Sequence, residues 1–389
     1  MNFEIKFIKY TSILTIITDW LSDIYETEFY LNISRGIRML LLFWFLIGVV
    51  RNFNVIKSYF LTYYFIIAFI FFSLYIQTDP NPMEGFWHLS KILYWFTGTM
   101  YFYYLLIKNK ITYEYLFSWI KILIIIAFIF TNYYLYIGKL YEEYNANAYL
   151  MVFLFPLFVF NIENIGKQKL LLFLLLYSVV ITLKRGALLS ISLTLFIAIL
   201  AYLINTKRVS VLNRVYYFLL IIISGLIIYM YMMSNYAERI EERFSEEQLD
   251  FYEDKAGSGR SGMYRRLYEE WSDSKGYTYF FGYGNQADSY RIPGRRTHAH
   301  SEFFGWIYNY GLMGLLLYIL QYVFLIFFFI KNYKFLKGYK YLYFIFFTIV
   351  AVVNFISGFY RDTYTFYLFL TPVLLNVIVN NRKLEYAKD

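Results

Sequence analysis

Residues 312–330 read LMGLLLYILQYVFLIFFFI, and no charged side chain interrupts this stretch. A bilayer core about 30 Å thick is crossed by roughly 20 mostly apolar residues in an α-helix. Comparable apolar stretches recur along the chain, at 40–50, 59–76, 92–107, 120–137 and 212–233. The sequence therefore predicts an all-α transmembrane protein that crosses the bilayer many times.

The composition supports this prediction and excludes several other classes. Of 389 residues, 60% are hydrophobic and 16% are charged, whereas soluble domains carry about a quarter charged residues. The net charge of +9 comes from Lys and Arg in short connectors, without a basic helix or an RNA-binding motif, so we expect no nucleic acid partner. The chain has no Cys, which excludes disulfides, thiol nucleophiles and cysteine metal sites.

About twelve membrane spans are predicted. They lie near residues 7–20, 34–50, 58–76, 88–107, 115–137, 147–162, 169–183, 187–204, 214–233, 303–330, 341–357 and 363–380. The first segment has an alternative placement, flat in the membrane interface, because Lys9 and Asp19 bracket a short apolar run.

The connectors between these spans are asymmetric in charge. One side carries eighteen Lys and Arg residues and the short connectors of the other side carry six. Basic residues in short loops mark the cytoplasmic side, so both termini are predicted to be cytoplasmic. The chain then divides into spans one to nine (1–233), a large outer loop (234–303) and spans ten to twelve (304–389).

The outer loop has a composition unlike the rest of the chain. It holds ten basic residues, thirteen acidic residues, and both His298 and His300. Helical spacing of Tyr264, Leu267, Tyr268 and Trp271 predicts an amphipathic helix over 260–273. The other expected features are a surface helix at 237–254, a flexible break at 255–259, a turn at 282–284 and a basic loop at 291–296.

Arg185 stands between two apolar blocks at the outer boundary, within the sequence TLKRGALL at 182–189. A charge at such a depth is costly, so it commonly faces a water-filled cavity or a partner. The alternative is a side chain that reaches the interface from a helix end, which suffices to explain Lys184. The small residues Gly186 and Ala187 would let a ligand approach Arg185, which favours a functional role.

His298 and His300 lie where the outer loop re-enters the membrane. Imidazole titrates near neutrality, so His300 can accept a proton from a hydroxyl group. The pair could instead make ordinary interfacial hydrogen bonds, or bind zinc together with Glu302. Neither an HExxH motif nor a third nearby His is present, so we predict no metal site.

Arginine is frequent on the predicted outer side. Its guanidinium group forms bidentate hydrogen bonds with phosphate oxygens, so such a group of side chains suits a diphosphate. The alternative is a set of solvated charges balanced by the acidic residues of the loop. The residues concerned are Arg260, Arg265, Arg266, Arg291, Arg295 and Arg296 in the loop, and Arg35, Arg38 and Arg361 in shorter connectors.

These motifs resemble those of the O-antigen ligase and polymerase superfamily of bacterial envelope glycosyltransferases. That family carries an Arg-x3-Leu element in an outer connector, which Arg185 to Leu189 match. It also carries His, then Asn, Ser or Gln, nine residues and Gly-x-x-Gly, which His300, Ser301, Gly311 and Gly314 match with the same spacing. Gly259-Arg260 resembles the start of the family's outer-loop helix. The resemblance covers mainly residues 180–320.

The resemblance implies a GT-C-type glycosyltransferase in the bacterial inner membrane, with its active site facing the periplasm. Its substrates would be oligosaccharides linked to undecaprenyl diphosphate, with membrane lipids and a chain-length regulator protein as further partners and no cofactor. By the same resemblance, Arg185 and Arg260 would bind the diphosphate, and His300 would activate the acceptor hydroxyl. To the residues that would bind the diphosphate we add Arg265, Arg35 and Arg361. We expect His298 and Glu302 to support His300.

The acceptor distinguishes the members of this superfamily. A Wzy-type polymerase adds repeat units of O-antigen or capsule, a ligase transfers the glycan to lipid A–core, and a third group modifies protein. We favour the polymerase and keep the ligase as its alternative. A transporter of lipid-linked sugars is the non-enzymatic alternative, in which Lys91 and Lys121 would line a path, but no repeat between the two halves of the sequence supports it.

Overall fold

The computed structural model describes residues 3–75, 78, 81–137, 146–160, 168–182, 184–205, 256–291, 301–356 and 363–387. These residues form helices and turns, and no strand occurs among them. The predicted all-α class is therefore confirmed for this part of the chain.

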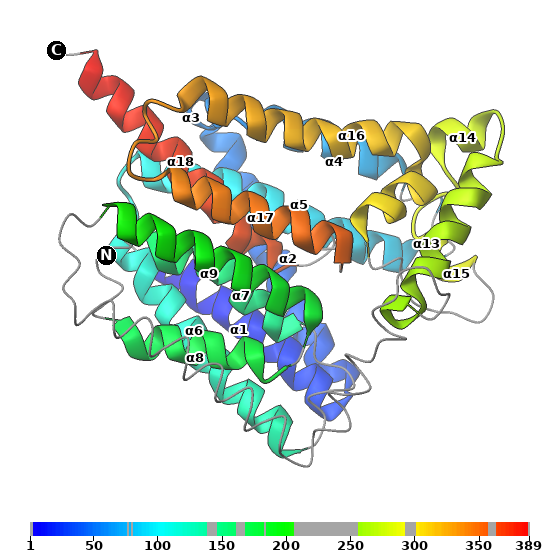
Figure 1. The fold of residues 1–389 in the computed structure, drawn as a ribbon, viewed down its shortest axis with the longest axis horizontal. Coiled ribbons are helices and arrows are strands. Elements are labelled where there is room, and N and C mark those ends of the chain that lie inside the picture. The colour runs from blue at the N-terminus through cyan, green and yellow to red at the C-terminus, as the bar shows by residue number, and fades with distance from the viewer. Residues whose placement is uncertain are drawn as a thin grey trace.

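The helices follow one another in the order expected from the apolar stretches (Figure 1). Their bounds are α1 (Phe3–Tyr25), α2 (Glu28–Arg51), α3 (Phe53–Ile56), α4 (Thr62–Tyr75), α5 (Pro82–Ile107), α6 (Tyr113–Tyr136), α7 (Ala146–Phe158), α8 (Lys169–Val180), α9 (Arg185–Asn205), α13 (Ala256–Ser272), α14 (Tyr277–Phe281), α15 (Ala287–Tyr290), α16 (Glu302–Asn332), α17 (Lys340–Ile356) and α18 (Thr365–Tyr386). Each predicted span overlaps one of them except that at 214–233, which lies outside the described residues, as does the surface helix predicted at 237–254.

Local sequence sets where individual helices begin. Asn81 precedes α5, and its side chain accepts a hydrogen bond from the Met83 amide, with Pro82 as the first helical residue. Thr112 caps α6 in the same way, accepting from the Tyr115 amide. Both caps satisfy amides that the first helical turn leaves without a partner.

Among the described residues, α2, α6 and α16 are long and apolar enough to cross a membrane, and several shorter apolar helices accompany them. The surface of α16 carries a row of exposed apolar side chains, namely Leu316, Ile319, Val323, Phe327 and Ile330. Exposed apolar surface of this extent is unusual for a soluble monomer and suits contact with lipid. The helices are those of a membrane protein.

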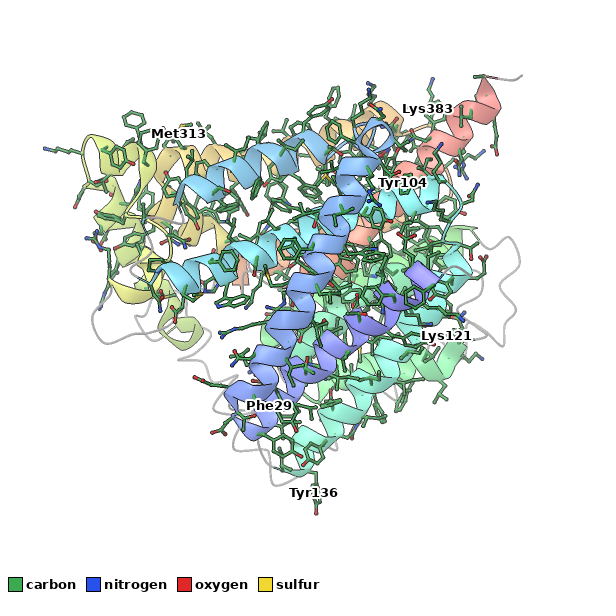
Figure 2. The ribbon with its side chains drawn as sticks, turned by 180° about the vertical axis from the view of Figure 1, so that it is seen from behind. Phe29, Tyr104, Lys121, Tyr136, Met313 and Lys383 are labelled. Carbon is green, nitrogen blue, oxygen red and sulfur yellow. The ribbon has the colours of Figure 1, made fainter. Side chains whose placement is uncertain are left out.

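The chain ends and the outer-loop helices lie at opposite ends of the molecule. Figure 1 shows both termini at one end and α13, α14 and α15 at the other. From behind, Tyr104 and Lys383 lie toward the end with the termini, whereas Met313 lies beside the outer-loop helices (Figure 2). This arrangement agrees with the predicted topology, in which the termini and the large loop face opposite sides of the membrane.

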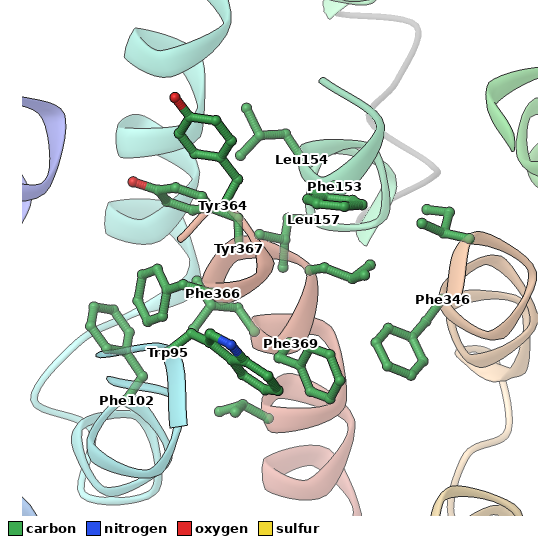
Figure 3. Close-up of a cluster of buried hydrophobic side chains, with 14 of the residues drawn as sticks. Trp95, Phe102, Phe153, Leu154, Leu157, Phe346, Tyr364, Phe366, Tyr367 and Phe369 are labelled. Atoms are coloured by element: carbon green, nitrogen blue, oxygen red, sulfur yellow. The ribbon is translucent and has the colours of Figure 1, made fainter. Parts of the chain in front are cut away.

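The core of the helical bundle is built around α18. The α18 residues from Thr365 to Leu375 are all buried, and their aromatic rings pack against α5 (Figure 3). The ring centroids of Trp95 and Phe369 lie 4.6 Å apart, and those of Phe102 and Phe366 lie 5.2 Å apart. Aromatic pairs at such distances contribute about 0.5–1.5 kcal/mol beyond the burial of their area.

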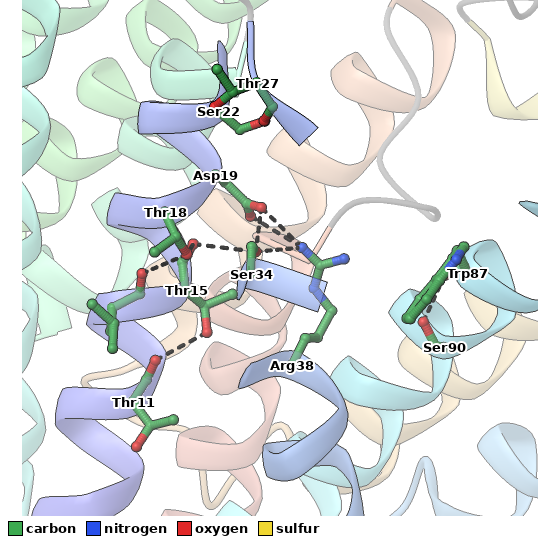
Figure 4. Close-up of polar contacts among 11 residues, drawn as sticks. Thr11, Thr15, Thr18, Asp19, Ser22, Thr27, Ser34, Arg38, Trp87 and Ser90 are labelled. Atoms are coloured by element: carbon green, nitrogen blue, oxygen red, sulfur yellow. Dashed lines mark hydrogen bonds and ion pairs between the residues drawn. The ribbon is translucent and has the colours of Figure 1, made fainter. Parts of the chain in front are cut away.

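The two charges that complicated the first predicted span are paired within the bundle. Lys9 is buried and donates to Ser118 of α6 over 3.0 Å. Asp19 accepts from Arg38 of α2 over 3.1 and 3.2 Å, and Ser34 bridges the same two side chains (Figure 4). Because both charges have partners on neighbouring helices, α1 packs along α2 as part of the bundle. Arg38 was expected to face the outer water, but its side chain is only 4% exposed.

The start of α13 corrects the prediction of a flexible break at 255–259. Residues 256–259 form its first turn, although three of them are Gly or Ser. Glycine costs a helix up to about 1 kcal/mol per residue, but tertiary packing commonly overrides this preference. Here the next turns of α13 carry the buried residues Met263, Leu267 and Trp271, which hold the helix against α16.

Candidate functional site

The predicted amphipathic helix at 260–273 is confirmed as part of α13. Met263, Leu267 and Trp271 follow one another at four-residue spacing and form a small core with Ile307 and Tyr308 of α16. On the same side, the ring of Tyr264 stacks on that of Phe304, with centroids 4.6 Å apart. The outer loop therefore has a core of its own, and that core seats α13 on the first part of α16.

The tenth predicted span is not one straight helix. Gly311 has φ 63° and ψ −155°, which divides α16 into a first arm, residues 302–310, and a second arm, residues 312–332. The two arms run back along each other. The rings of Phe303 and Trp306 lie 6.3 and 5.7 Å from that of Tyr318, although 15 and 12 residues separate them along the chain.

The Gly-x-x-Gly motif makes this reversal possible. The backbone angles of Gly311 lie in a region that residues with a side chain rarely adopt. At Gly314, a Cβ atom would approach the carbonyl oxygen of Trp306 to 2.9 Å and would also meet Tyr310. One glycine therefore provides the turn, and the other lets the arms approach closely.

The turn at 282–284 is confirmed, and it fits against the reversal in α16. A helix break leaves carbonyl groups without their usual partners four residues later. The loop supplies replacements, since the Tyr283 amide donates to Tyr308 over 3.0 Å and the Gly284 amide donates to Asn309 over 2.9 Å. A Cβ on Gly311 would lie 2.5 Å from the Gly282 nitrogen, so these two backbone segments pack without intervening side chains.

Buried polar side chains fix the same loop to the first arm. The Asn309 side chain donates to Asp288 over 2.8 Å and accepts from the Asp288 amide over 2.9 Å. Tyr310 donates to Asn285 over 2.7 Å, and the Asn285 amide donates to Thr78 over 2.8 Å. These four hydrogen bonds are 2.7–2.9 Å long, so the loop holds the reversal of α16 in one geometry.

Glu270 connects α13, the loop and α16. Its carboxylate accepts from the hydroxyl of Tyr308 over 2.8 Å and from Arg291 over 3.0 Å. Its backbone carbonyl accepts from Tyr283 over 2.8 Å, and the Arg291 guanidinium lies 3.9 Å from the centre of the Tyr283 ring. Burial raises the pKa of the Tyr283 hydroxyl, and the negative charge of Glu270 raises it further. Arg291, one of the arginines considered for phosphate, thus has a structural partner.

The first arm brings Ser301 and Glu302 back beside the second arm. Glu302 begins α16 and accepts a hydrogen bond from the Trp306 indole over 2.9 Å. Its charge also acts on the hydroxyl groups of Tyr318 and Tyr322. His300 and His298 lie outside the described residues, but the chain that carries His300 enters α16 at this point.

Arg185 and Arg260 both lie at or near helix starts. Arg185 is the first residue of α9, which packs against α17, and Arg260 lies near the start of α13. Figure 1 shows these helix starts and the start of α16 toward the same end of the molecule. Nothing is described of the two side chains, and Arg361 lies outside the described residues.

Arg35 and Arg265 have other neighbours. Arg35 lies over the ring of Trp87 on α5, 5.2 Å from its centre, and donates to Asn32 over 3.4 Å. Arg265 is 60% exposed and lies 4.0 Å from Glu269 one helical turn away. Their proposed part in phosphate binding stays a prediction, and Arg265 lies on the side of α13 away from α16.

Sequence reasoning missed the residues that shape this site. It did not identify Glu270, Tyr308, Asn309 or Asp288, because their partners lie between 21 and 38 residues away in the chain. A signal was available for one of them, since Asn309 is a polar residue inside an otherwise apolar stretch. Such a residue in a membrane helix needs a partner and thereby indicates a contact.

Comparison with known proteins gives one family. Residues 170–319 match the family model described as O-Antigen ligase. That match includes α9, α13 and the reversal in α16. No curated protein matches the chain. The family covers O-antigen ligases and polymerases, which are glycosyltransferase-like enzymes. The expected resemblance is therefore confirmed over residues 170–319, which are similar to the O-antigen ligase and polymerase superfamily.

Proposed function

We propose that this protein polymerises oligosaccharide repeat units carried on undecaprenyl diphosphate, at the periplasmic face of the bacterial inner membrane. One observation carries the proposal. The family match spans the segment in which α9, α13 and α16 begin, and these starts bear Arg185, Arg260 and the chain entering from His300. The GT-C architecture and about twelve spans are part of the same proposal.

The proposed reaction is a substitution at the anomeric carbon of the donor sugar. The oxygen of an acceptor hydroxyl forms the new glycosidic bond while the bond to the diphosphate oxygen breaks. His300 takes the hydroxyl proton, and the diphosphate leaves with the bonding electron pair. Arg185 and Arg260 stabilise its developing negative charge, which is the main electrostatic requirement of the step.

The reversal in α16 supports this assignment of roles. It brings Glu302, two residues after His300 in the sequence, close to Tyr318 of the second arm, and the contacts of Glu270 and Asn309 hold the first arm in place. A general base must lie within hydrogen-bond reach of the proton it removes, so a firmly held segment suits the role. His298 and Glu302 would support His300 by hydrogen bonding and by charge.

Substitution of His300 tests the enzymatic proposal against the transporter alternative. We expect His300→Ala to abolish glycan transfer while the protein still accumulates in the membrane at wild-type level. Thr297→Ala, a change in the same segment at a residue without a proposed role, serves as the control and should retain the transfer. Unaltered transfer in His300→Ala would exclude this residue as the base and favour transport.

The lipopolysaccharide or capsule profile of a deletion strain separates polymerase from ligase. Loss of a polymerase should leave a single repeat unit on the lipid A–core. Loss of a ligase should leave polymer on undecaprenyl diphosphate and none on the core. The second result would replace the polymerase proposal by its ligase alternative.

A further inference from the structure

Polar side chains of the second arm of α16 and of the last turn of α17 contact one another, and the first arm of α16 begins close to them. The hydroxyl groups of Tyr318 and Tyr322 lie 3.0 Å apart, and the Asn354 side-chain amide donates to Tyr322. Asn354 belongs to the last turn of α17, and Ser301 immediately precedes the first arm. We call Ser301, Tyr318, Tyr322 and Asn354 the hydroxyl cluster.

The hydroxyl cluster has hydrogen-bonding capacity that the protein does not use. Ser301 is 3% exposed and Asn354 is 2% exposed, yet neither the Ser301 Oγ nor the Asn354 Oδ1 has a partner among the described residues. Tyr318 and Tyr322 have two hydroxyl hydrogens, and the bond between them uses one. The cluster thus offers a free donor, a free acceptor, and a hydroxyl that can serve as either.

Unused polar groups in this position require an explanation. Nine-tenths or more of buried polar groups in proteins are paired, and lipid offers no water to replace a missing partner. The cluster also lies next to Glu302, whose charge acts on both tyrosines, so the surroundings are polar and not simply badly packed. A ligand with several hydroxyl groups would form hydrogen bonds with the free donor, the free acceptor and the remaining hydroxyl of the cluster.

Aromatic rings lie next to the same polar side chains. Phe303 and Trp306 of the first arm lie next to Tyr318, and the ring of Tyr322 lies 5.8 Å from that of Phe347 on α17. Sugars present hydroxyl groups at their edges and C–H groups on their faces. Polar groups placed between aromatic side chains are therefore suited to one sugar ring, as in small-molecule sites generally.

We propose that the hydroxyl cluster is a subsite for one sugar ring of the lipid-linked substrate, bound through Asn354 Oδ1, Ser301 Oγ and the tyrosine hydroxyls. This proposal rests on the proposed function and deepens it. Because Ser301 of the cluster directly follows His300 in the sequence, the ring it binds is one close to the reacting bond. The cluster thereby selects for the sugar, whereas the arginines act on the diphosphate.

Replacement of Asn354 by an apolar residue of similar size gives the decisive test. If Asn354 has only a structural part, Asn354→Leu removes its hydrogen bond to Tyr322, which should lower the melting temperature but leave the KM unchanged. If it binds sugar, we expect the KM for the lipid-linked repeat unit to rise about tenfold at nearly constant kcat, a change of roughly 1.4 kcal/mol. Tyr322→Phe, which keeps the ring, should raise the KM several-fold and guards against misfolding of the first variant.

Asn332 is the matched control. It lies at the other end of α16, is 4% exposed, and its Oδ1 is likewise without a partner. Asn332→Leu should therefore leave the KM at the wild-type value. An equal KM in wild type, Asn354→Leu and Tyr322→Phe would overturn the subsite.

A binding measurement separates this proposal from the proposed function. Thermal unfolding of the purified full chain is measured with undecaprenyl diphosphate alone and with undecaprenyl diphosphate bearing one repeat unit, extracted from the deletion strain. Wild type should be stabilised more by the sugar-bearing lipid, and Asn354→Leu should lose that difference. The same difference in both proteins would overturn the subsite, whereas binding without any transfer by wild type would refute the polymerase and leave a sugar site.

Discussion

Gly311 is constrained both by its backbone angles and by its close neighbours, and substitutions can separate the two effects. Its backbone angles exclude side-chain-bearing residues at a cost of roughly 1–3 kcal/mol, and an added Cβ would also meet Gly282 and Phe280 at 2.5–2.7 Å. Gly276 has a similar φ of 61° but open space around it. Gly36 lies within α2 and also has open space.

We expect alanine at these three positions to give a graded series of stabilities. Gly311→Ala should lower the melting temperature of the purified protein most, because it adds a clash to backbone strain. Gly276→Ala should lower it less, and Gly36→Ala should leave it unchanged or raised, since alanine favours helices. Thermal unfolding in detergent measures the order. Equal melting temperatures for Gly311→Ala and Gly276→Ala would show that the close contact with residues 280–282 is absent.

The pair Glu270 and Tyr308 should show measurable coupling. The hydroxyl of Tyr308 donates to a carboxylate 38 positions away in the chain, so its loss frees both α13 and the first arm. Because Glu270 is 44% exposed, we expect a coupling of at most about 1 kcal/mol in a double-mutant cycle of Tyr308→Phe and Glu270→Gln. The exposed pair Arg265 and Glu269 provides the control and should couple by nearly zero.

At the scale of elements, hydropathy predicts where helices occur but not how they bend. The apolar stretch 312–330 and the spacing of Leu267 and Trp271 predicted α16 and α13 correctly. The reversal at Gly311 was not predicted, because a single glycine is tolerated within a membrane helix and carries no local sign of a turn. Its position follows only from contacts with residues 280–284, which are distant in sequence.

Cysteine cross-linking can establish the two-armed form of α16, since the chain has no Cys of its own. Positions 303 and 318 would be roughly 22 Å apart in a straight helix, at 1.5 Å per residue. Their rings instead lie 6.3 Å apart. In the double variant Phe303→Cys, Tyr318→Cys, each cysteine replaces a larger ring, so a bifunctional thiol reagent shorter than about 10 Å should give bridged product, as read by mass spectrometry.

A second pair within one arm serves as the control for this measurement. Leu316→Cys with Lys331→Cys has the same spacing in sequence and lies entirely on the second arm, with both positions exposed. It should give two singly modified cysteines and no bridge. Bridging of neither pair would indicate a straight α16.

At the scale of the whole molecule, the charge asymmetry of the connectors predicts one orientation, and the termini lie at the opposite end from the outer-loop helices. Lys275 lies between α13 and α14, and Lys337 lies between α16 and α17. Both are exposed, so cysteines there should be accessible from water. The sequence predicted this sidedness from short loops alone, whereas the convergence of α9, α13 and α16 at one end needed the fold.

Membrane-impermeant maleimide provides the test of orientation. In cells with a permeabilised outer membrane, we expect Lys275→Cys to be labelled and Lys337→Cys to be labelled only after lysis. Ala148→Cys, at a fully buried position, controls for reagent entry and should react only after denaturation. The reverse pattern for the two lysine positions would place the outer-loop helices in the cytoplasm.

The reversal in α16 also determines how many times the chain crosses the bilayer. A segment that turns back to the side from which it came adds no crossing, however deeply it dips. Only the second arm of α16 is therefore counted, and α17 and α18 follow it as a pair. The depth of the first arm can vary among related chains without changing the side on which residues 333–339 and the C-terminal end of α18 emerge. Changes in the first arm thus leave the number of membrane crossings unaltered.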